Sequence, residues 1–167
     1  MHKHKILLID DEQPILNALT RVFHNSSYEL FTATSAEQAL GFLERNNIDL
    51  IICDYQLGGM NGIDFLENIS KDNPDIINIL LTAHADLDMA IDAINRAVLY
   101  KFIMKPWNDN NLLITVRRAL EQRDLIIENK RLMNEIKKRD IYIKQLEKES
   151  PGITDIKRDD SGNIIIE

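Results

Sequence analysis

The stretch Ile6-Leu7-Leu8-Ile9-Asp10-Asp11 is a short apolar run that ends in two carboxylates. Unbroken apolar runs of this length are typical of strands that are covered on both faces of a parallel sheet. Three later runs also end in a polar residue that can take part in chemistry: residues 50–53 before Asp54, 79–81 before Thr82, and 102–104 before Lys105. Because the carboxyl ends of parallel strands share one edge of a sheet, we expect these polar groups to meet in one pocket.

Strand-like and helix-like segments alternate along the chain. Residues 5–10, 28–33, 49–54, 76–82 and 100–104 have strand character. Between them, apolar side chains are spaced along single helix faces: Ile15, Leu16, Leu19, Val22 and Phe23, then Ala36, Ala39, Leu40 and Leu43, and later Leu87, Ala90, Ile91, Ile94, Ala97 and Val98. Pro14 and Ser35 suit helix starts. The alternation predicts an α/β fold, a doubly wound five-stranded parallel sheet with helices on both faces. Segment 28–33 is the least apolar strand, so we expect it at an edge.

The composition limits the kind of protein. The 167 residues allow one domain of about 100 to 150 residues and some further length. A formal net charge of −7 argues against nucleic acid as a direct partner, because phosphate binding requires a concentrated basic face. The single cysteine, Cys53, lies in an apolar run, which indicates a core position and a reducing compartment. No window approaches the roughly 20 apolar residues of a membrane helix, and the first apolar run is too short for a signal peptide. We therefore expect a cytoplasmic protein without membrane contact.

A long helical segment follows the sheet. It begins at about Asp109, extends the last helix of the fold, and meets no proline or glycine before Pro151 and Gly152. We divide the chain into a domain at 1–119, a helical extension at 120–149, and a tail at 150–167 that forms a hairpin or is disordered. The extension carries a seam with alternating steps of four and three residues: Leu125, Asn129, Leu132, Ile136, Arg139, Ile143 and Leu146.

This seam predicts a parallel homodimer through a coiled coil. Asn129 falls at an a position, where asparagine favours two strands, and Arg139 is a weak point of the seam. The surrounding positions are heavily charged, so a solvated single helix is the alternative that stays open, although an isolated helix with so few apolar contacts is marginal in water.

The polar groups at the strand ends suit a divalent cation and a phosphoryl group. Three converging carboxylates, Asp10, Asp11 and Asp54, repel one another, and Mg²⁺ commonly binds one or two carboxylates together with phosphate oxygens. Lys105 and Thr82 are placed to neutralise and hydrogen-bond phosphoryl oxygens. An aspartate can also act as the nucleophile and form an acyl phosphate. We choose Asp54 for this role, because it is a lone acid that ends a central strand and precedes a glycine-bearing loop.

The residues named so far resemble a receiver domain of bacterial two-component response regulators, over residues 4 to about 119. Four segments in order carry the resemblance: residues 6–12, 54–62, 81–83 and 102–107. The resemblance implies a flavodoxin-like sheet with strand order 2-1-3-4-5. It also implies a histidine kinase or phosphotransfer protein as partner.

The resemblance assigns a role to each site position. Asp54 corresponds to the phosphoacceptor. Asp11, Asp54 and the backbone carbonyl of Gln56 would bind Mg²⁺ directly, and Asp10 would act mainly through water. Thr82 would hydrogen-bond the phosphoryl group, and Lys105 would pair with it.

Further positions correspond to the conformational switch of such domains. Phe102 matches an aromatic residue that turns inward when Thr82 moves toward the phosphoryl group. This movement reshapes the surface formed by helix 4, strand 5 and helix 5. Ala83 is suitably small for the phosphoryl entry route, and Lys105-Pro106 matches a peptide bond that is cis in the family.

The chain departs from the family pattern after the phosphoacceptor position. Residues 57–59 read Leu57-Gly58-Gly59, where the family more often has methionine, proline and glycine, so we expect a looser loop here. Gln56 and His84 occupy positions that tune the lifetime of the acyl phosphate in the family. That lifetime is not predicted.

Other classes of protein fit the sequence less well. A haloacid dehalogenase-like phosphatase needs a second aspartate two residues after the nucleophile, but Asp54-Tyr55-Gln56 lacks it. A nucleotide-binding protein would need a glycine-rich phosphate loop, which is absent. A receiver fold that only dimerises is the remaining alternative. We therefore expect a phosphoacceptor that turns over no external substrate and controls an output domain or partner outside this sequence.

Overall fold

The computed structural model describes residues 2–96, 98–153 and 160–161. The chain divides into two compact units, Met1–Leu125 and Ile126–Glu167. The first unit ends a few residues beyond the boundary that we predicted at residue 119. The hairpin predicted for the tail at 150–167 lies largely outside the described residues.

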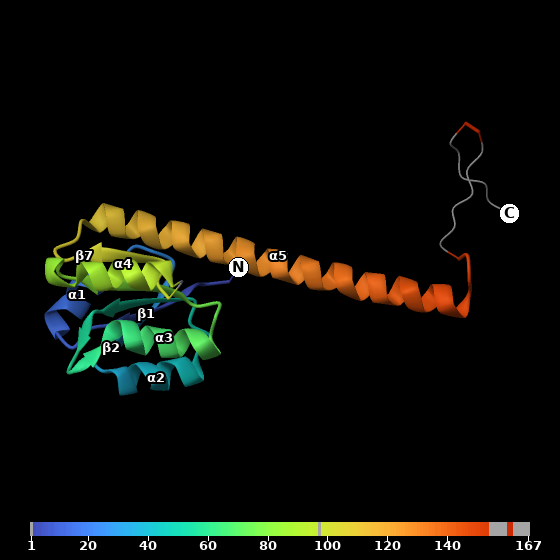
Figure 1. Ribbon diagram of the computed structural model, residues 1–167. Helices are drawn as coiled ribbons and strands as arrows, with labels where there is room; N and C mark the ends of the chain where they lie inside the picture. Colours follow the sequence, from blue (N-terminus) through green and yellow to red (C-terminus); the bar gives the residue numbers. More distant parts are fainter. Residues whose placement is uncertain (1, 97, 154–159, 162–167) are drawn as a thin grey trace. The chain divides into compact units, whose positions relative to one another are not determined.

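The first unit is built on a parallel sheet of five strands in the order β2-β1-β3-β6-β7 (Figure 1). The strands are β1 (Lys5–Ile9), β2 (Glu29–Ala33), β3 (Leu50–Asp54), β6 (Ile77–Thr82) and β7 (Lys101–Met104). Counted among these five, the order is 2-1-3-4-5, so the predicted topology is confirmed. The prediction that segment 28–33 lies at an edge is also confirmed.

Helices cover both faces of the sheet, as predicted. They are α1 (Gln13–Val22), α2 (Ala36–Arg45), α3 (Gly62–Asp72), α4 (Leu87–Asn95) and α5 (Asp109–Glu149). On one face, strand residues such as Leu7 and Ile51 pack with apolar residues of α2, α3 and α4. On the other face, neighbours such as Leu8 and Ile52 pack with α1 and the first part of α5. The alternation of side chains along each strand thus produces two cores, one on each face.

Local signals account for the helix starts. Pro14 lies in the first turn of α1, where its missing N–H costs nothing. Ser35 caps α2, because its hydroxyl accepts the Gln38 N–H at 3.1 Å while the Gln38 side chain accepts the Thr34 N–H at 2.8 Å. The apolar helix face that we predicted from Leu87 to Val98 is too long. Helix α4 ends at Asn95, and Val98 is buried in the following loop.

Helix α5 is tied to the amino-terminal edge of the sheet within the first unit. Arg123 Nη1 lies 3.0 Å from Asp49 Oδ1, and Arg123 Nε donates to the Asp75 carbonyl at 2.8 Å. Asp49 is buried and also accepts the Lys5 N–H at 2.8 Å. A buried carboxylate must be paired in this way, so these contacts fix the end of α5 that belongs to the first unit.

Beyond Leu125, α5 continues as a charged helix. Intrahelical ion pairs join Glu128 to Arg131 and Glu135 to both Arg131 and Arg139. Two residues of the predicted seam, Leu132 and Ile136, are 42% and 52% exposed. The coiled coil therefore stays a prediction. None of the helices described has the length and apolar character to cross a membrane.

Candidate functional site

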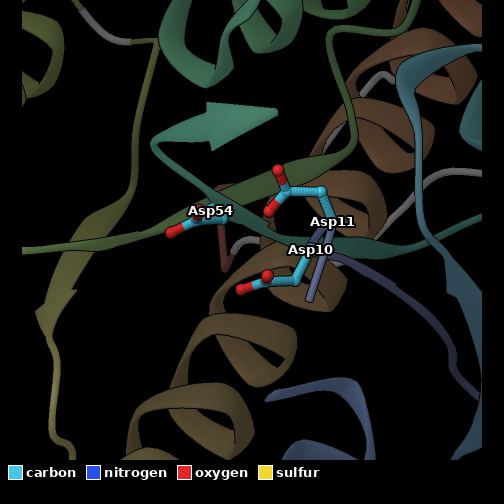
Figure 2. A group of neighbouring side chains, drawn as sticks. All are labelled: Asp10, Asp11 and Asp54. Atoms are coloured by element: carbon cyan, nitrogen blue, oxygen red, sulfur yellow. The ribbon is translucent and has the colours of Figure 1, made fainter. Parts of the chain in front are cut away.

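Three carboxylates come together at the carboxyl edge of the sheet (Figure 2). Asp10 and Asp11 follow β1, and Asp54 is the last residue of β3, which pairs with β1 in parallel register from Ile6 opposite Leu50. One oxygen of each carboxylate lies within 4.8 Å of the others. The convergence predicted from the strand ends is confirmed.

Lys105 joins two of these carboxylates. Its Nζ lies 2.7 Å from Asp54 Oδ1 and 3.0 Å from Asp10 Oδ2, so one ammonium group bridges acids from two strands. Burial alone would lower the pKa of Lys105, but its hydrogen bonds to Asp54 and Asp10 outweigh burial and raise the pKa above its usual value. Lys105 therefore stays charged at neutral pH.

Asp10 is the buried member of the acid group. Its side chain is 0% exposed, and it accepts the Glu12 N–H at 2.9 Å in addition to the Lys105 contact. Burial raises the pKa of Asp10 above its ordinary value, although the Glu12 N–H and Lys105 oppose the shift. Asp11 is exposed and Asp54 is partly buried, so solvent reaches the group from their side.

Thr82 lies at the same edge of the sheet, as the last residue of β6. The side chain is buried, and Oγ1 donates to the Ala83 carbonyl at 3.1 Å. The Thr82 carbonyl accepts the Lys105 N–H at 2.9 Å, so the two residues are held together through their backbones. Within the described residues, no hydrogen bond joins Thr82 to Asp54.

The predicted switch position lies on the last strand of the sheet. Phe102 is in β7 opposite Leu80, partly buried against the core of the α2, α3 and α4 face. It also lines a surface hollow of about 360 Å³ that includes Thr115 of α5. The Lys105-Pro106 bond is cis, as predicted. Cys53 is buried in the same core, as predicted, and burial raises the pKa of its thiol.

The loop after Asp54 forms a small hairpin of β4 (Gln56–Leu57) and β5 (Met60–Asn61). That this loop is looser than in other members of the family stays a prediction. The hairpin places Gln56 and Asp11 in one hollow of about 410 Å³. Two adjacent glycines between short paired segments are a hairpin signal, and it could have been recognised in the sequence.

Gly62 falls within the matched segment 54–62, but nothing in the sequence indicated its close approach to Asp54. A β-carbon at Gly62 would collide with the backbone oxygen of Asp54 and lie 3.2 Å from the Tyr55 carbonyl oxygen. The Gly62 N–H also donates to the Tyr55 carbonyl at 2.6 Å. Only glycine permits the start of α3 to lie this close to the strand end that carries Asp54.

Comparison with known proteins identifies the fold family. A family model of the response regulator receiver domain matches residues 6–117, and the matched region contains every site residue described above. The chain belongs to the receiver domain family.

The curated relatives of this receiver are longer regulatory proteins, and the match covers only a part of each. It is 32% identical over 120 residues to the hydrogenase transcriptional regulatory protein HoxA of Cupriavidus necator, covering 72% of this chain and 25% of HoxA. It is 35% identical over 134 residues to the alginate biosynthesis transcriptional regulatory protein AlgB of Pseudomonas putida, covering 80% of this chain and 30% of AlgB. The chain thus spans less than a third of the curated relatives it matches.

A solved receiver has the same architecture. The signal receiver domain of an HD domain-containing protein from Pseudomonas fluorescens superposes with a TM-score of 0.72 at 35% identity. The likeness covers 77% of this chain and 94% of the solved one.

The donor set of this receiver fits a hard divalent cation. Asp10, Asp11 and Asp54 offer only oxygen atoms, which Mg²⁺ prefers over nitrogen and sulfur. Lys105 balances one negative charge of the three, so a cation would still be attracted to the group.

Proposed function

We propose that this receiver accepts a phosphoryl group on Asp54 from a histidine kinase or phosphotransfer protein. The observation that carries the proposal is the Lys105 ammonium, 2.7 Å from Asp54 Oδ1 and 3.0 Å from Asp10 Oδ2, beside the exposed Asp11. This arrangement combines an accessible nucleophile with a fixed positive charge where phosphoryl oxygens would lie.

The transfer step follows from the positions of these groups. A carboxylate oxygen of Asp54 attacks phosphorus, a new O–P bond forms, and the N–P bond of the phosphohistidine donor breaks, leaving its electron pair on the imidazole nitrogen. Lys105 would pair with a phosphoryl oxygen, since its ammonium already lies 2.7 Å from Asp54 Oδ1. The Thr82 hydroxyl turns from the Ala83 carbonyl to a phosphoryl oxygen, a route that the small Ala83 leaves open.

Asp11, Asp54 and the Gln56 carbonyl would hold Mg²⁺ directly in this proposal, with Asp10 acting through water. When bound, the ion neutralises negative charge on the phosphoryl oxygens. Asp10 is suited to an indirect role, because it is the buried member of the group and already pairs with Lys105.

The proposed output is a change of the surface formed by α4, β7 and α5. Movement of Thr82 leaves space into which the partly buried Phe102 can turn. The receiver then controls an output domain or partner, and it turns over no external substrate. We place it in the cytoplasm, where its phosphodonor would act.

Treatment with acetyl phosphate tests the phosphoacceptor function. The intact mass of the protein should rise by one phosphoryl group when Mg²⁺ is present, and the adduct should disappear in alkaline hydroxylamine. Chelation of the metal with EDTA should reduce labelling by at least about tenfold, because charge neutralisation supplies several kcal/mol. Absence of an adduct, under conditions that label a control receiver, would favour a receiver fold that only dimerises.

We further propose that the extension of α5 forms a parallel homodimer that transmits the switch to the output. The exposed seam residues Leu132, Ile136 and Ile143 support this proposal, because a second copy would cover them. Ile136→Lys should weaken the dimer by at least about a hundredfold, since two charges enter one seam.

Ile141→Lys is the matched control for the dimer. Ile141 is 66% exposed and lies off the seam, so this variant should remain dimeric. Sedimentation velocity separates the outcomes. A monomeric wild type would favour the solvated single helix, and equal behaviour of both variants would exclude the seam as the dimer contact.

A further inference from the structure

We infer that the Gly58–Gly59 turn is a positioning element for the metal site, in which the Gly58 N–H orients the Asp11 carboxylate as a Mg²⁺ ligand. The inference rests on the proposed function and extends it to the loop in which the chain departs from the family pattern. Asp11 and the hairpin that carries Gly58 line one hollow of about 410 Å³, so the two parts already share the candidate site.

The turn has a defined conformation. Gln56 pairs with Asn61 and Leu57 with Met60, which leaves Gly58 and Gly59 as a two-residue connection. Their φ angles are +52° and +97°, and positive values at both central residues are those of a type I′ turn. Side chains with a β-carbon rarely adopt this conformation, so the two glycines permit the tight connection.

The hairpin is fixed at both ends. Its first end is held by Tyr55, whose N–H donates to the Leu81 carbonyl at 2.9 Å and whose carbonyl accepts the Gly62 N–H at 2.6 Å. The side chain of Leu57 is buried in the core. At the second end, the Asn61 side chain caps α3 by accepting the Ile63 N–H at 2.8 Å. These contacts determine where the Gly58 N–H lies.

From this position Gly58 holds Asp11. The Gly58 N–H donates to Asp11 Oδ2 at 3.2 Å. Among the described residues, no other donor forms a hydrogen bond with this exposed carboxylate. A carboxylate has about four lone-pair directions, so one bond restricts its rotation and leaves the others for a metal. Proline, the residue that the family more often has here, carries no N–H and could not make this contact.

Magnesium titration by calorimetry, on the full chain without phosphodonor, tests the inference. Gly58→Val and Gly58→Asn form a matched pair, because a β-carbon at Gly58 meets no atom within 4 Å. The β-carbon itself therefore causes no collision in either variant, and the two variants differ in their preference for positive φ. Asparagine tolerates positive φ, whereas a β-branched residue does not.

We expect Gly58→Val to weaken Mg²⁺ binding by about tenfold, the usual effect of removing a group that orients a metal ligand. Gly58→Asn should stay within about twofold of the wild type, because it keeps the turn and the N–H. Circular dichroism checks the fold of each variant. Should Gly58→Val fail to fold, Gly58→Ala replaces it. We expect alanine to weaken Mg²⁺ binding by about threefold, because its penalty for positive φ is smaller than that of valine.

Each outcome decides the matter. Wild-type affinity in the valine or alanine variant would overturn the inference while the proposed function stands. An equal loss of Mg²⁺ affinity in the valine and asparagine variants would also overturn it, because the backbone conformation at Gly58 would then not be the cause of the loss. A wild type that is phosphorylated at Asp54 yet binds no Mg²⁺ in the titration would overturn this inference and the metal assignment together.

Discussion

Replacement of Asp54 by asparagine should abolish the labile phosphoryl adduct formed with acetyl phosphate and Mg²⁺. The amide has nearly the shape of the carboxylate but lacks the nucleophilic oxygen that forms the acyl phosphate. It also removes the negative charge that Lys105 Nζ contacts at 2.7 Å. Intact-mass measurement should show a loss of at least about a thousandfold in labelling rate, the scale expected when a nucleophile is removed.

Asp72→Asn provides the control for this experiment. Asp72 is an exposed residue at the end of α3, remote in sequence from the acid group, and the same chemical change there should leave labelling unchanged. A labile adduct that persists in Asp54→Asn would assign the phosphoacceptor to another carboxylate. Asp11 would then be the first residue to test, because it is the exposed acid of the group.

The sheet and the site were predictable from the sequence for the same physical reason. Parallel strands are covered on both faces, so they appear as apolar runs, and residues 6–9 and 50–53 are buried throughout. Their common direction then brings Asp10, Asp54 and Lys105 to one edge. Topology alone determines this convergence, and no information on side-chain contacts is needed.

Features that depend on single contacts were not predictable in this way. The β4 and β5 segments have two residues each, which is too short for a period-two pattern, and only Gly58 and Gly59 signal the hairpin. The Thr82 hydroxyl donates to the Ala83 carbonyl, a local contact that no pattern in the sequence indicates. The role of Gly62 depends on an approach between backbones, which leaves no pattern of apolar residues in the sequence.

The substitution Gly62→Ala should impair both folding and phosphorylation, although it adds a single methyl group. The added carbon would collide with the Asp54 carbonyl oxygen and lie 3.1 Å from the Asp54 carbonyl carbon, so the backbone at the phosphoacceptor must shift. Overpacking of this kind costs about 1–3 kcal/mol, which urea denaturation would measure as a lower free energy of unfolding. A displacement of about 1 Å at a reacting group can slow a reaction by about a hundredfold, so labelling of Asp54 should fall on that scale.

Gly41→Ala is the control, because it makes the same chemical change at a glycine where the added carbon causes no collision. Gly41 lies inside α2, where an added β-carbon meets no atom within 4 Å. Because alanine is a better helix former than glycine, this variant should be stabilised by about 0.5–1 kcal/mol and labelled at the wild-type rate. If the same substitution lowers the free energy of unfolding at Gly62 and raises it at Gly41, the cost at Gly62 comes from its contact with Asp54. If Gly62→Ala matched the wild type in both measurements, the close approach of α3 to Asp54 would not constrain the phosphoacceptor.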